Sequence, residues 1–395
     1  MTSESMLASE PLRLLTVTNY FPSHGGGIER VAERLTEEFG KHRILVEWIS
    51  SDTDPPPEPT SNRASISVPT LNVIERRTQL PYPIWWPSGL PALWRAIGRA
   101  DVVHVHEHLY FGSILAVCMA RLRGHPVMVT QHMGALGLRK RLFTAVYEAA
   151  ARGLGFVIFG LATRVVFISA NVRSFFRLDE CAKARLVFNG IDPVRFKPTS
   201  EERRRALRAE LGIEPHRLAV LFVGRYVRKK GLHILESLAS GHPDLLWVFA
   251  GAGPEDPSNW NRDNVLQLGR VAQEKLSDLY QAADLLILPS SGEGLPLVVQ
   301  EALACGLGVL STEEVRDACP PAKELIRAHT TPRNAPDIEG WGRAIRRVLA
   351  DPKYLGEREE RARRAHQLWS WESCASQYLL LFDEIRPKHA LGGVQ

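Results

Sequence analysis

Short apolar runs alternate with amphipathic stretches along most of the chain. The runs RLLTVTNYFP, ILVEWIS and DLLILP are rich in apolar residues, as expected of strands buried in a parallel sheet. Between the first two runs, Ile28, Val31, Leu35 and Phe39 lie at helical spacing, and Gly40 ends the pattern. This alternation of strands and helices predicts an α/β fold with parallel sheets.

The length of the chain predicts two such units. At 395 residues it exceeds what one ordinary hydrophobic core organises, so two domains are expected. The second half begins with LAVLFVGRYVRKKGLHILESLA and repeats the alternation of strands and helices with short connections. It therefore reads as a second α/β domain.

The composition is typical of a globular protein with anionic partners. Hydrophobic residues make up 45% and charged residues 24% of the chain, and its formal net charge is +5. The scattered basic residues match no nucleic-acid-binding fingerprint, so no nucleic acid partner is expected; anionic lipid and nucleoside diphosphates remain.

The cysteines and the lengths of the apolar runs indicate where in the cell the protein is located. The five cysteines are far apart and form no CxxC pair, which favours a reducing cytoplasm. The start MTSESMLASEPLR lacks the features of a signal peptide, and GLGFVIFGLA is too short to span a bilayer. We therefore expect a cytoplasmic protein and leave peripheral contact with the inner face of the cell membrane open.

Two groups of candidate metal ligands are better explained without a metal. Asp52 and Asp54 form a DxD pattern, but prolines follow at once, which favours a polar loop. His104, His106 and His108 alternate along one predicted strand, so we expect all three on one face, as polar lining of a cleft between the domains. Nothing nearby supplies the further ligands that a metal site needs.

The most informative stretch is 289–310, PSSGEGLPLVVQEALACGLGVL. The run DLLILP predicts a buried strand before it, and LPLVVQEALA predicts a helix with Pro296 near its start. Free backbone N–H groups at the start of such a helix suit a phosphate. Glu293 in the turn and Glu301 about two helical turns later could accept sugar hydroxyls. A sugar linked to a diphosphate needs both features.

This phrase closely resembles the Glu-x7-Glu signature of retaining glycosyltransferases of the "group 1", or family four, class. The resemblance implies the GT-B fold, in which two Rossmann-like doubly wound domains face a cleft and a C-terminal helix crosses back to the N-terminal domain. In that family the first glutamate holds the donor sugar and the second holds the nucleotide ribose. The resemblance assigns these roles to Glu293 and Glu301.

Other segments match the same family. The phrase Asn189-Gly190-Ile191-Asp192 resembles the exit to the interdomain linker. It implies an acceptor-binding domain over 1–195, a nucleotide-sugar-binding domain over 196–369, and a last helix at 370–386 that packs back on the first domain. Past Leu310, the segment STEEVRDACPPAKELIRAHTTP departs from the family pattern, so the donor sugar and base are not readable.

The resemblance also implies the remaining site residues. Arg225 and Lys230 match the pair that reaches the donor diphosphate, and fixed cations there remove the need for a metal or other cofactor. His132 matches a histidine at the end of a strand beside the reacting centre. The catalytic set is then His132, Glu293, Arg225 and Lys230. The donor-binding set is Gly25, Gly26, Gly27, Arg225, Lys230, Arg270, Val271, Glu293, Gly294, Leu295, Leu297, Val298 and Glu301.

Two surface segments have open interpretations. Trp85, Trp86 and Trp94 lie in a proline-rich stretch and suit either a membrane interface or apolar acceptor groove, or the capping of a core. The basic run 139–141, followed by apolar residues, predicts either an interfacial helix or an ordinary packing helix.

We therefore predict a retaining, metal-independent glycosyltransferase that moves a hexose-type sugar from a nucleotide diphosphate sugar to an acceptor. The acceptor would be a lipid-linked or polysaccharide or glycolipid precursor. Two alternatives stay open: a sugar-nucleotide epimerase of the GT-B fold, and a non-catalytic sugar-nucleotide-binding protein at the membrane surface.

Overall fold

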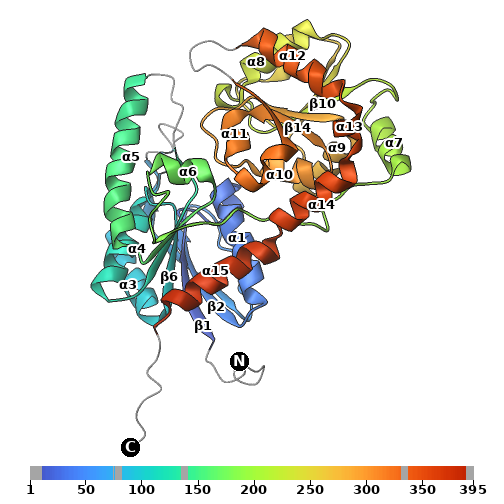
Figure 1. Cartoon of the computed structure of the whole chain (residues 1–395). Helices are drawn as coiled ribbons and strands as arrows, with labels where there is room; N and C mark the ends of the chain where they lie inside the picture. Colours follow the sequence, from blue (N-terminus) through green and yellow to red (C-terminus); the bar gives the residue numbers. More distant parts are fainter. Residues whose placement is uncertain (1–10, 74, 76–81, 135–140, 331–336, 388–395) are drawn as a thin grey trace, which may run out of the picture.

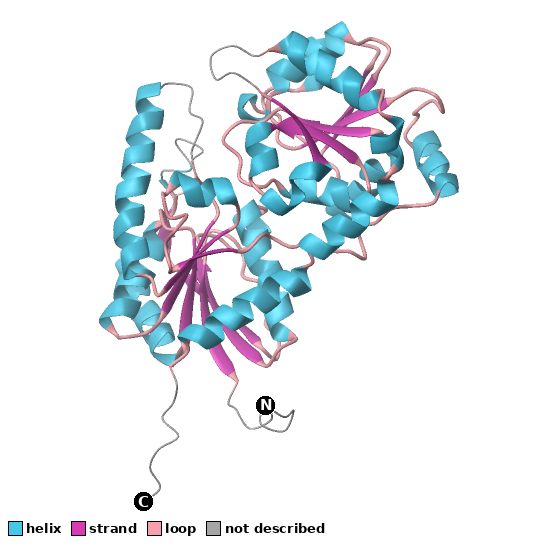
Figure 2. Ribbon diagram, in the orientation of Figure 1, coloured by secondary structure: helices cyan, strands magenta, loops and turns pink. Residues whose placement is uncertain are grey.

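Two parallel sheets, each covered by helices on both faces, make up the body of the protein (Figures 1 and 2). The structure is a computed structural model, and it describes residues 11–73, 75, 82–134, 141–330 and 337–387. The predicted α/β architecture with two Rossmann-like sheets is confirmed.

The first sheet has seven strands in the order β3-β2-β1-β6-β7-β8-β9, all paired in parallel. The strands are β1 (Leu12–Val17), β2 (Ile44–Ser51), β3 (Arg63–Val68), β6 (Val102–His106), β7 (Val127–Gln131), β8 (Arg164–Phe167) and β9 (Ala184–Leu186). The helices between them are α1 (Gly27–Gly40), α3 (Leu90–Arg99), α4 (Phe111–Leu122), α5 (Arg141–Leu161) and α6 (Ala170–Phe175). A hairpin of β4 (Thr70–Leu71) and β5 (Ile84–Trp85) stands beside the sheet.

The second sheet has six parallel strands in the order β12-β11-β10-β13-β14-β15. They are β10 (Ala219–Val223), β11 (Leu246–Ala250), β12 (Val265–Gly269), β13 (Leu285–Leu288), β14 (Gly308–Thr312) and β15 (Ile326–His329). The helices are α7 (Glu201–Glu210), α8 (Leu232–Gly241), α9 (Leu276–Ala282), α10 (Leu297–Ala304), α11 (Glu313–Asp317), α12 (Ile338–Leu349), α13 (Pro352–Gly356) and α14 (Arg358–Leu368).

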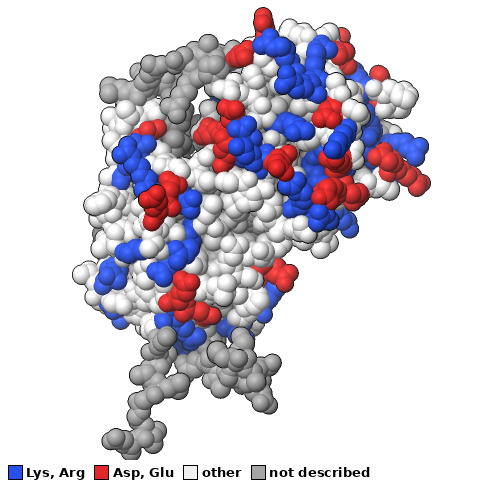
Figure 3. Space-filling view, viewed as in Figure 1, with Lys and Arg blue, Asp and Glu red and all other residues white. Residues whose placement is uncertain are grey.

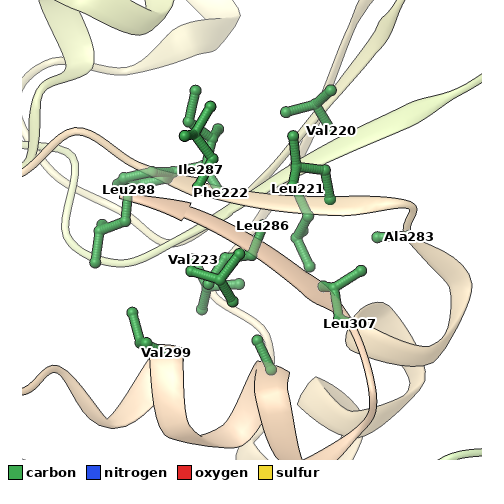
Figure 4. Close-up of a cluster of buried hydrophobic side chains, with 14 of the residues drawn as sticks. Val220, Leu221, Phe222, Val223, Ala283, Leu286, Ile287, Leu288, Val299 and Leu307 are labelled. Atoms are coloured by element: carbon green, nitrogen blue, oxygen red, sulfur yellow. The ribbon is translucent and has the colours of Figure 1, made fainter. Parts of the chain in front are cut away.

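The core of the second domain is a continuous apolar layer under α10. Side chains of β10 and β13, such as Leu221, Phe222 and Ile287, are fully buried in one cluster that also contains Val299 of α10 (Figure 4). Both strands are apolar at every position because helices cover both faces of the sheet. This packing holds the turn between β13 and α10 in a fixed place at the carboxyl edge of the sheet.

The last helix, α15 (Trp371–Ile385), crosses back to the first domain, as predicted (Figure 1). Its residues Trp371, Tyr378 and Phe382 are buried in one cluster with side chains of α1, β1 and β2. Phe39 of α1 packs edge-on against Phe382, with ring centroids 5.4 Å apart. The helix therefore completes one face of the N-terminal sheet.

Helix α5 is longer than the apolar run GLGFVIFGLA indicated. It extends over Arg141–Leu161, and the window Thr144–Leu161 is long and apolar enough to cross a membrane by length and composition alone. Only 22% of that window is buried inside the protein. The expectation of a short apolar segment was therefore wrong. The basic residues 139 and 140 lie outside the described residues.

The tryptophans of the proline-rich stretch divide between the two interpretations. Trp85 is buried and packs so closely on Gly112 of α4 that a Cβ there would overlap its ring. Trp86 and Trp94 are 50% and 41% exposed. One ring therefore caps the core, and two remain at the surface.

Candidate functional site

A cavity of about 500 Å³ lies between the two domains. One wall is formed by α1 and the linker after β9, and the other by the ends of β10, β11 and β12 together with α10. This is where open α/β sheets bind ligands, because the carboxyl ends of parallel strands meet at one edge. The charged residues lining it are Arg30, Glu33, Arg34, Asp192, Arg195, Arg225, Arg270 and Glu301. Five of these eight are arginines, so the cavity suits an anion.

The glycines after β10 and β11 let the backbone approach closely at this edge. The N–H of Gly224 donates to the carbonyl of Ala250 at 3.0 Å, and that of Gly251 donates to Gly269 at 2.7 Å. A Cβ on Gly251 would lie 1.8 Å from the carbonyl oxygen of Gly224. Both glycines line the cavity, and larger residues would close this part of it.

Glu301 lies on α10 with its carboxylate in the cavity wall. The hydroxyl of Tyr280 donates to its Oε2 at 2.8 Å. Burial raises the pKa of Glu301, and the nearby positive charges of Arg30 and Arg195 oppose this shift. The fixed carboxylate can accept hydrogen bonds from neighbouring ligand hydroxyls, as the ribose role requires.

Lys230 and Glu293 form an ion pair beside the cavity. Lys230 Nζ lies 3.0 Å from Glu293 Oε1, and both side chains are largely buried. Lys230 ends a 3-10 turn, Arg228–Lys230, and Gly231 follows with φ of 84° against the carbonyl of Pro289. A Cβ at Gly231 would lie 2.5 Å from that oxygen, so the lysine loop packs directly on the glutamate turn.

The turn before α10 is less open than predicted. The N–H of Gly292 donates to Glu314 Oε2 at 2.9 Å, so a carboxylate of α11 already satisfies one predicted phosphate donor. Glu314 belongs to the segment that departs from the family pattern. Burial lowers the pKa of Lys229, which also faces Glu293 and Glu314.

Helix α1 begins directly after the glycine loop. Gly25 has φ of 81° and lines the cavity, whereas Gly26 is the N-cap residue of α1 and Gly27 its first residue. The carboxylate of Glu29 folds over Gly26, where a Cβ would meet its Oε2 at 2.0 Å. Burial raises the pKa of Glu29. A side chain of the helix itself thus lies beside the N–H groups predicted to face phosphate.

The structure divides the predicted donor-binding residues into two groups. Those that line the cavity are Gly25, Arg225, Arg270, Val271, Leu297, Val298 and Glu301. Those that do not are Gly26, Gly27, Lys230, Glu293, Gly294 and Leu295. Leu295 belongs to the core, and a Cβ on Gly294 would lie 3.1 Å from Ser169 Oγ of the first domain. The individual roles of these residues stay predictions.

His132 follows β7 and is held by a second histidine. His106 Nδ1 and His132 Nε2 are 3.0 Å apart, and the two rings stack with centroids 5.3 Å apart. Burial lowers the pKa of His132 to about 4 and that of His104 to about 3. His132 keeps 8% of its surface accessible but does not line the 500 Å³ cavity.

The expectation that His104, His106 and His108 share one face was wrong. Strand β6 ends at His106, and Glu107 with φ of 70° turns the chain. His108 then packs on Phe159 of α5, on the opposite side of the sheet from Tyr378 of α15, against which His104 lies. All three histidines are buried, so they do not line the cleft either.

The buried pair of Glu107 and His108 has a separate structural role. His108 Nδ1 lies 3.1 Å from Glu107 Oε1, and His108 Nε2 lies 3.0 Å from the carbonyl of Ala151 in α5. The carboxylate also accepts the N–H of Met133 at 3.0 Å. The Glu107 carboxylate raises the pKa of His108 against the opposing effect of burial. The pair connects the ends of β6 and β7 to α5.

Candidate metal ligands do not converge in the described part of the chain, where no group of three or more His, Cys, Asp or Glu residues could hold an ion. Asp52 accepts hydrogen bonds from Thr70, and Asp54 lies 2.9 Å from His24. These contacts place the DxD pattern in a polar loop.

Sequence reasoning missed the cavity residues that come from the first domain and the linker: Arg30, Glu33, Arg34, Asp192 and Arg195. Arg30, Glu33 and Arg34 lie on the face of α1 away from Val31, Leu35 and Phe39, which are buried. The polar side of that amphipathic pattern was the available signal. Only the fold shows that this side faces Glu301.

Sequence comparison decides the family. Residues 25–195 match the family model described as "Glycosyltransferase Family 4", and residues 203–367 match "Glycosyl transferases group 1". The D-inositol 3-phosphate glycosyltransferase of Rhodococcus erythropolis is 30% identical over 327 residues, covering 73% of this chain and 71% of that protein. The chain belongs to the group 1, family 4 glycosyltransferases. Like the rest of its family, this glycosyltransferase is of the retaining class and takes its sugar from a nucleotide sugar.

Other relatives match over different lengths. Glycogen synthase of Mycobacterium tuberculosis is 25% identical over 408 residues, covering 92% of this chain and 93% of that protein. A protein of Bacillus subtilis named for teichuronic acid biosynthesis is 30% identical over 214 residues. That match covers 54% of this chain and 53% of the B. subtilis protein.

Solved structures confirm the GT-B fold of the glycosyltransferase. Sucrose-phosphate synthase from Thermosynechococcus elongatus superposes with a TM-score of 0.74 at 20% identity, covering 94% of this chain and 98% of that one. Anabaena HepE in complex with UDP and glucose superposes with a TM-score of 0.67 at 16% identity, covering 94% of this chain and 99% of that one. A complex of HepE with UDP-glucose superposes as well.

Proposed function

We propose that this glycosyltransferase moves a hexose from a nucleoside diphosphate sugar to a lipid-linked or polysaccharide-precursor acceptor without a metal ion. The observation that carries the proposal is the interdomain cavity, which five arginines line together with Glu301. The arginines match a diphosphate, and the carboxylate matches a ribose diol. HepE, which shares the fold, binds UDP-glucose, so UDP-glucose is the first donor to test.

In this proposal the charged groups act mainly on the leaving diphosphate. Negative charge develops on it as the sugar bond breaks, and Arg225 and Lys230 stabilise that charge without a metal. Glu293 orients the sugar and, through the 3.0 Å ion pair, holds the ammonium of Lys230. The acceptor attacks from the same face, and the leaving diphosphate takes its proton. Domain closure excludes water.

A panel of nucleotide sugars, with and without EDTA, tests the donor half of the proposal. We expect one nucleotide sugar to raise the Tm and to release its nucleoside diphosphate slowly in the absence of acceptor, equally with EDTA. Interconversion of the sugar without release would favour the epimerase instead. Loss of turnover in EDTA that returns on adding Mg²⁺ would contradict metal independence.

The acceptor half of the proposal rests on the outer face of α5. Within Thr144–Leu161 the exposed positions are Ala145, Val146, Ala149, Ala150, Gly153, Phe156, Val157 and Gly160, and none carries a charge. Phe156 is 84% exposed, Val146 58% and Val157 53%. Such a continuous apolar face on a surface helix is unusual for a protein surrounded by water on all sides.

We propose that an anionic bilayer covers this face. In Figure 1, α5 stands at the outer edge of the first domain and extends past the ends of its strands toward the level of the second domain. Few charged side chains appear along that edge in Figure 3, while the chain as a whole carries a net charge of +5. A bilayer beside α5 would bring a lipid-linked acceptor to the mouth of the cleft. The proposal includes a cytoplasmic location at the inner membrane face; the five cysteines are unpaired, as expected there.

Vesicle flotation tests the membrane surface. The protein should float with vesicles containing anionic lipid at low salt, and Phe156→Asp should reduce the floating fraction about tenfold, because a buried charge replaces apolar area. Leu380→Asp is the matched control, because Leu380 is 66% exposed on α15 and away from α5. Equal loss in both variants, or no flotation of the unchanged protein, would contradict the proposal. A concentration-dependent dimer abolished by Phe156→Asp would assign the face to a second copy of the chain instead.

A further inference from the structure

The buried histidines at the ends of β6 and β7 make a chain with a defined proton arrangement. His106 Nδ1 faces His132 Nε2 at 3.0 Å, so one of the two nitrogens must donate to the other. His106 Nε2, at the other end of that ring, is buried and has no hydrogen-bond partner among the residues that the structure describes. The position of the proton on His106 follows from these two facts.

A neutral imidazole carries one proton, on one of its two nitrogens. If Nδ1 of His106 accepted a hydrogen bond from His132, its proton would lie on Nε2, as a buried N–H without a partner. Orphaned buried N–H donors are rarer in proteins than acceptors left without a partner. The proton of His106 therefore lies on Nδ1, and this nitrogen donates to His132 Nε2.

Burial keeps both rings neutral near pH 7. Burial lowers the pKa of His106 well below its usual range, and the neighbouring His104 and His132 lower it further. Burial also lowers the pKa of His132 to about 4. The groups that face His106 are the imidazoles of His104 and His132. Glu107 favours the charged form of His132, but its carboxylate is already held by His108, Gln131 and Met133. A doubly protonated form of either ring is thus disfavoured.

We infer that His106 is a positioning residue that holds His132 in the tautomer with its proton on Nδ1. Nε2 of His132 then accepts from His106, and Nδ1 has no partner among the described residues, so it can donate a hydrogen bond to a ligand. This inference rests on the proposed function only for the claim that His132 meets a substrate.

The consequence for the reaction is that His132 supplies a hydrogen-bond donor and not a base. Its Nδ1 already carries a proton, and its Nε2 accepts from His106. Neither nitrogen can take the proton of an attacking hydroxyl. The proton of the acceptor must therefore leave by another group, in agreement with transfer to the leaving diphosphate.

The arrangement continues away from the site. His104 Nε2 lies 2.8 Å from Thr130 Oγ1, which lies 3.1 Å from the hydroxyl of Tyr378 on α15. The Nδ1 atom of His104 is buried and has no partner in the described part of the chain, so the same reasoning assigns the proton of His104 to Nε2. The rings of His104 and His106 are 4.3 Å apart and fill the space between β6 and the crossing helix. His106 thus has little freedom to rotate.

Nitrogen NMR of the full-length protein, labelled with 15N histidine, tests the inference directly, with ring signals assigned from the His106→Asn and His132→Asn variants. Near pH 7, both His106 and His132 should show a protonated Nδ1 and an unprotonated Nε2. A protonated Nε2 on His132 would overturn the inference. This reading does not depend on activity, so it stands apart from the proposed function.

Two variants of His106 with side chains of nearly equal shape test whether the tautomer of His132 affects the reaction rate. Asparagine at position 106 can place an N–H where Nδ1 of the histidine lies, whereas aspartate places only acceptor oxygens there. We expect His106→Asn to keep kcat within threefold, and His106→Asp to lower kcat at least tenfold with little change in donor KM. The aspartate should also move the proton of His132 to Nε2 and raise the pKa of His132.

Separate control experiments distinguish an effect on folding from an effect on the reaction. Thermal unfolding of both variants shows whether aspartate merely destabilises the domain; if it does, the comparison passes to His106→Asn, whose His132 should keep a protonated Nδ1. Equal rates for folded Asn and Asp variants would overturn the positioning role. If His132→Ala kept full turnover, His132 would have no role in the reaction. The tautomer measured by NMR in the unchanged protein would still stand.

Discussion

The loops after the strands of the second sheet and the ends of β6 and β7 in the first sheet have opposite chemistry. On the second domain, Arg225 and Arg270 line the cavity and Lys230 is paired with Glu293, so fixed charges dominate. On the first domain, His106 and His132 are buried and neutral, joined by one hydrogen bond. Charge stabilises the part of the reaction where charge develops, and neutral donors suffice where a sugar or an acceptor is only oriented.

The difference also concerns how each site is built. The charges of the second domain lie in loops that follow separate strands of one sheet: Arg225 and Lys230 after β10, Arg270 after β12 and Glu293 after β13. The neutral chain of the first domain depends on contacts between β6, β7 and α15, which joins residues 130 and 378. Perturbing the two edges should therefore have different signatures.

The largest effect is expected at Lys230. Lys230→Met removes the fixed cation that we propose lies beside the diphosphate and should lower kcat about 100-fold, the usual effect of deleting one group that stabilises transition-state charge. Arg228→Met, in the same 3-10 turn but exposed, is the matched control and should change kcat less than about twofold. Steady-state kinetics and Tm are measured together. If both variants lose activity equally, the charge at Lys230 has no special role.

A middle-sized effect is expected at Glu301. Glu301→Gln keeps the shape but weakens acceptance from the ribose, so the donor KM should rise about tenfold with kcat nearly unchanged. Because burial raises the pKa of Glu301 above the usual 4.5, its carboxylate gains a proton at a higher pH than an ordinary glutamate. The donor KM of the unchanged enzyme should therefore rise as pH falls toward that pKa, and the glutamine variant should lack this rise. A pH-dependent KM in both proteins would assign the titration to another group.

The smallest effect is expected at Arg30, a first-domain residue whose positive charge acts on Glu301 of the second domain. Arg30→Ala should raise the donor KM about threefold at low salt and less at high salt, because an exposed charge is screened. Lys41→Ala removes the same charge beyond the other end of α1 and serves as the control. A salt-independent loss would indicate a packing role for Arg30.

Local patterns predicted the fold well, and the roles assigned to the second-domain site residues stay predictions. Strands such as β10 and β13 are apolar at every position, and the loops that follow these two strands carry Lys230 and Glu293, whose side chains pair. In such cases the hydrophobic period and the turn residues carry most of the information. The family resemblance rested on the same short segments.

The first-domain site depended on features that no local pattern contains. Alternation predicted His108 on the face of His106, but the left-handed conformation of Glu107 turned it to the other side. The contact of Gly292 with Glu314 joins two turns of the second domain, and the approach of Arg30 to Glu301 joins the two domains. These pairings follow from how the sheets are arranged in space, which spacing along the sequence does not report.

Helix α15 has a consequence for how the protein is made. The N-terminal sheet buries Leu12, Leu14 and Val46 against Trp371, Tyr378 and Phe382, which follow the whole second domain along the chain. One face of the first domain therefore stays exposed to water throughout translation of the second. The domain that begins first is completed last, and chains that end before residue 371 should expose that apolar face and aggregate.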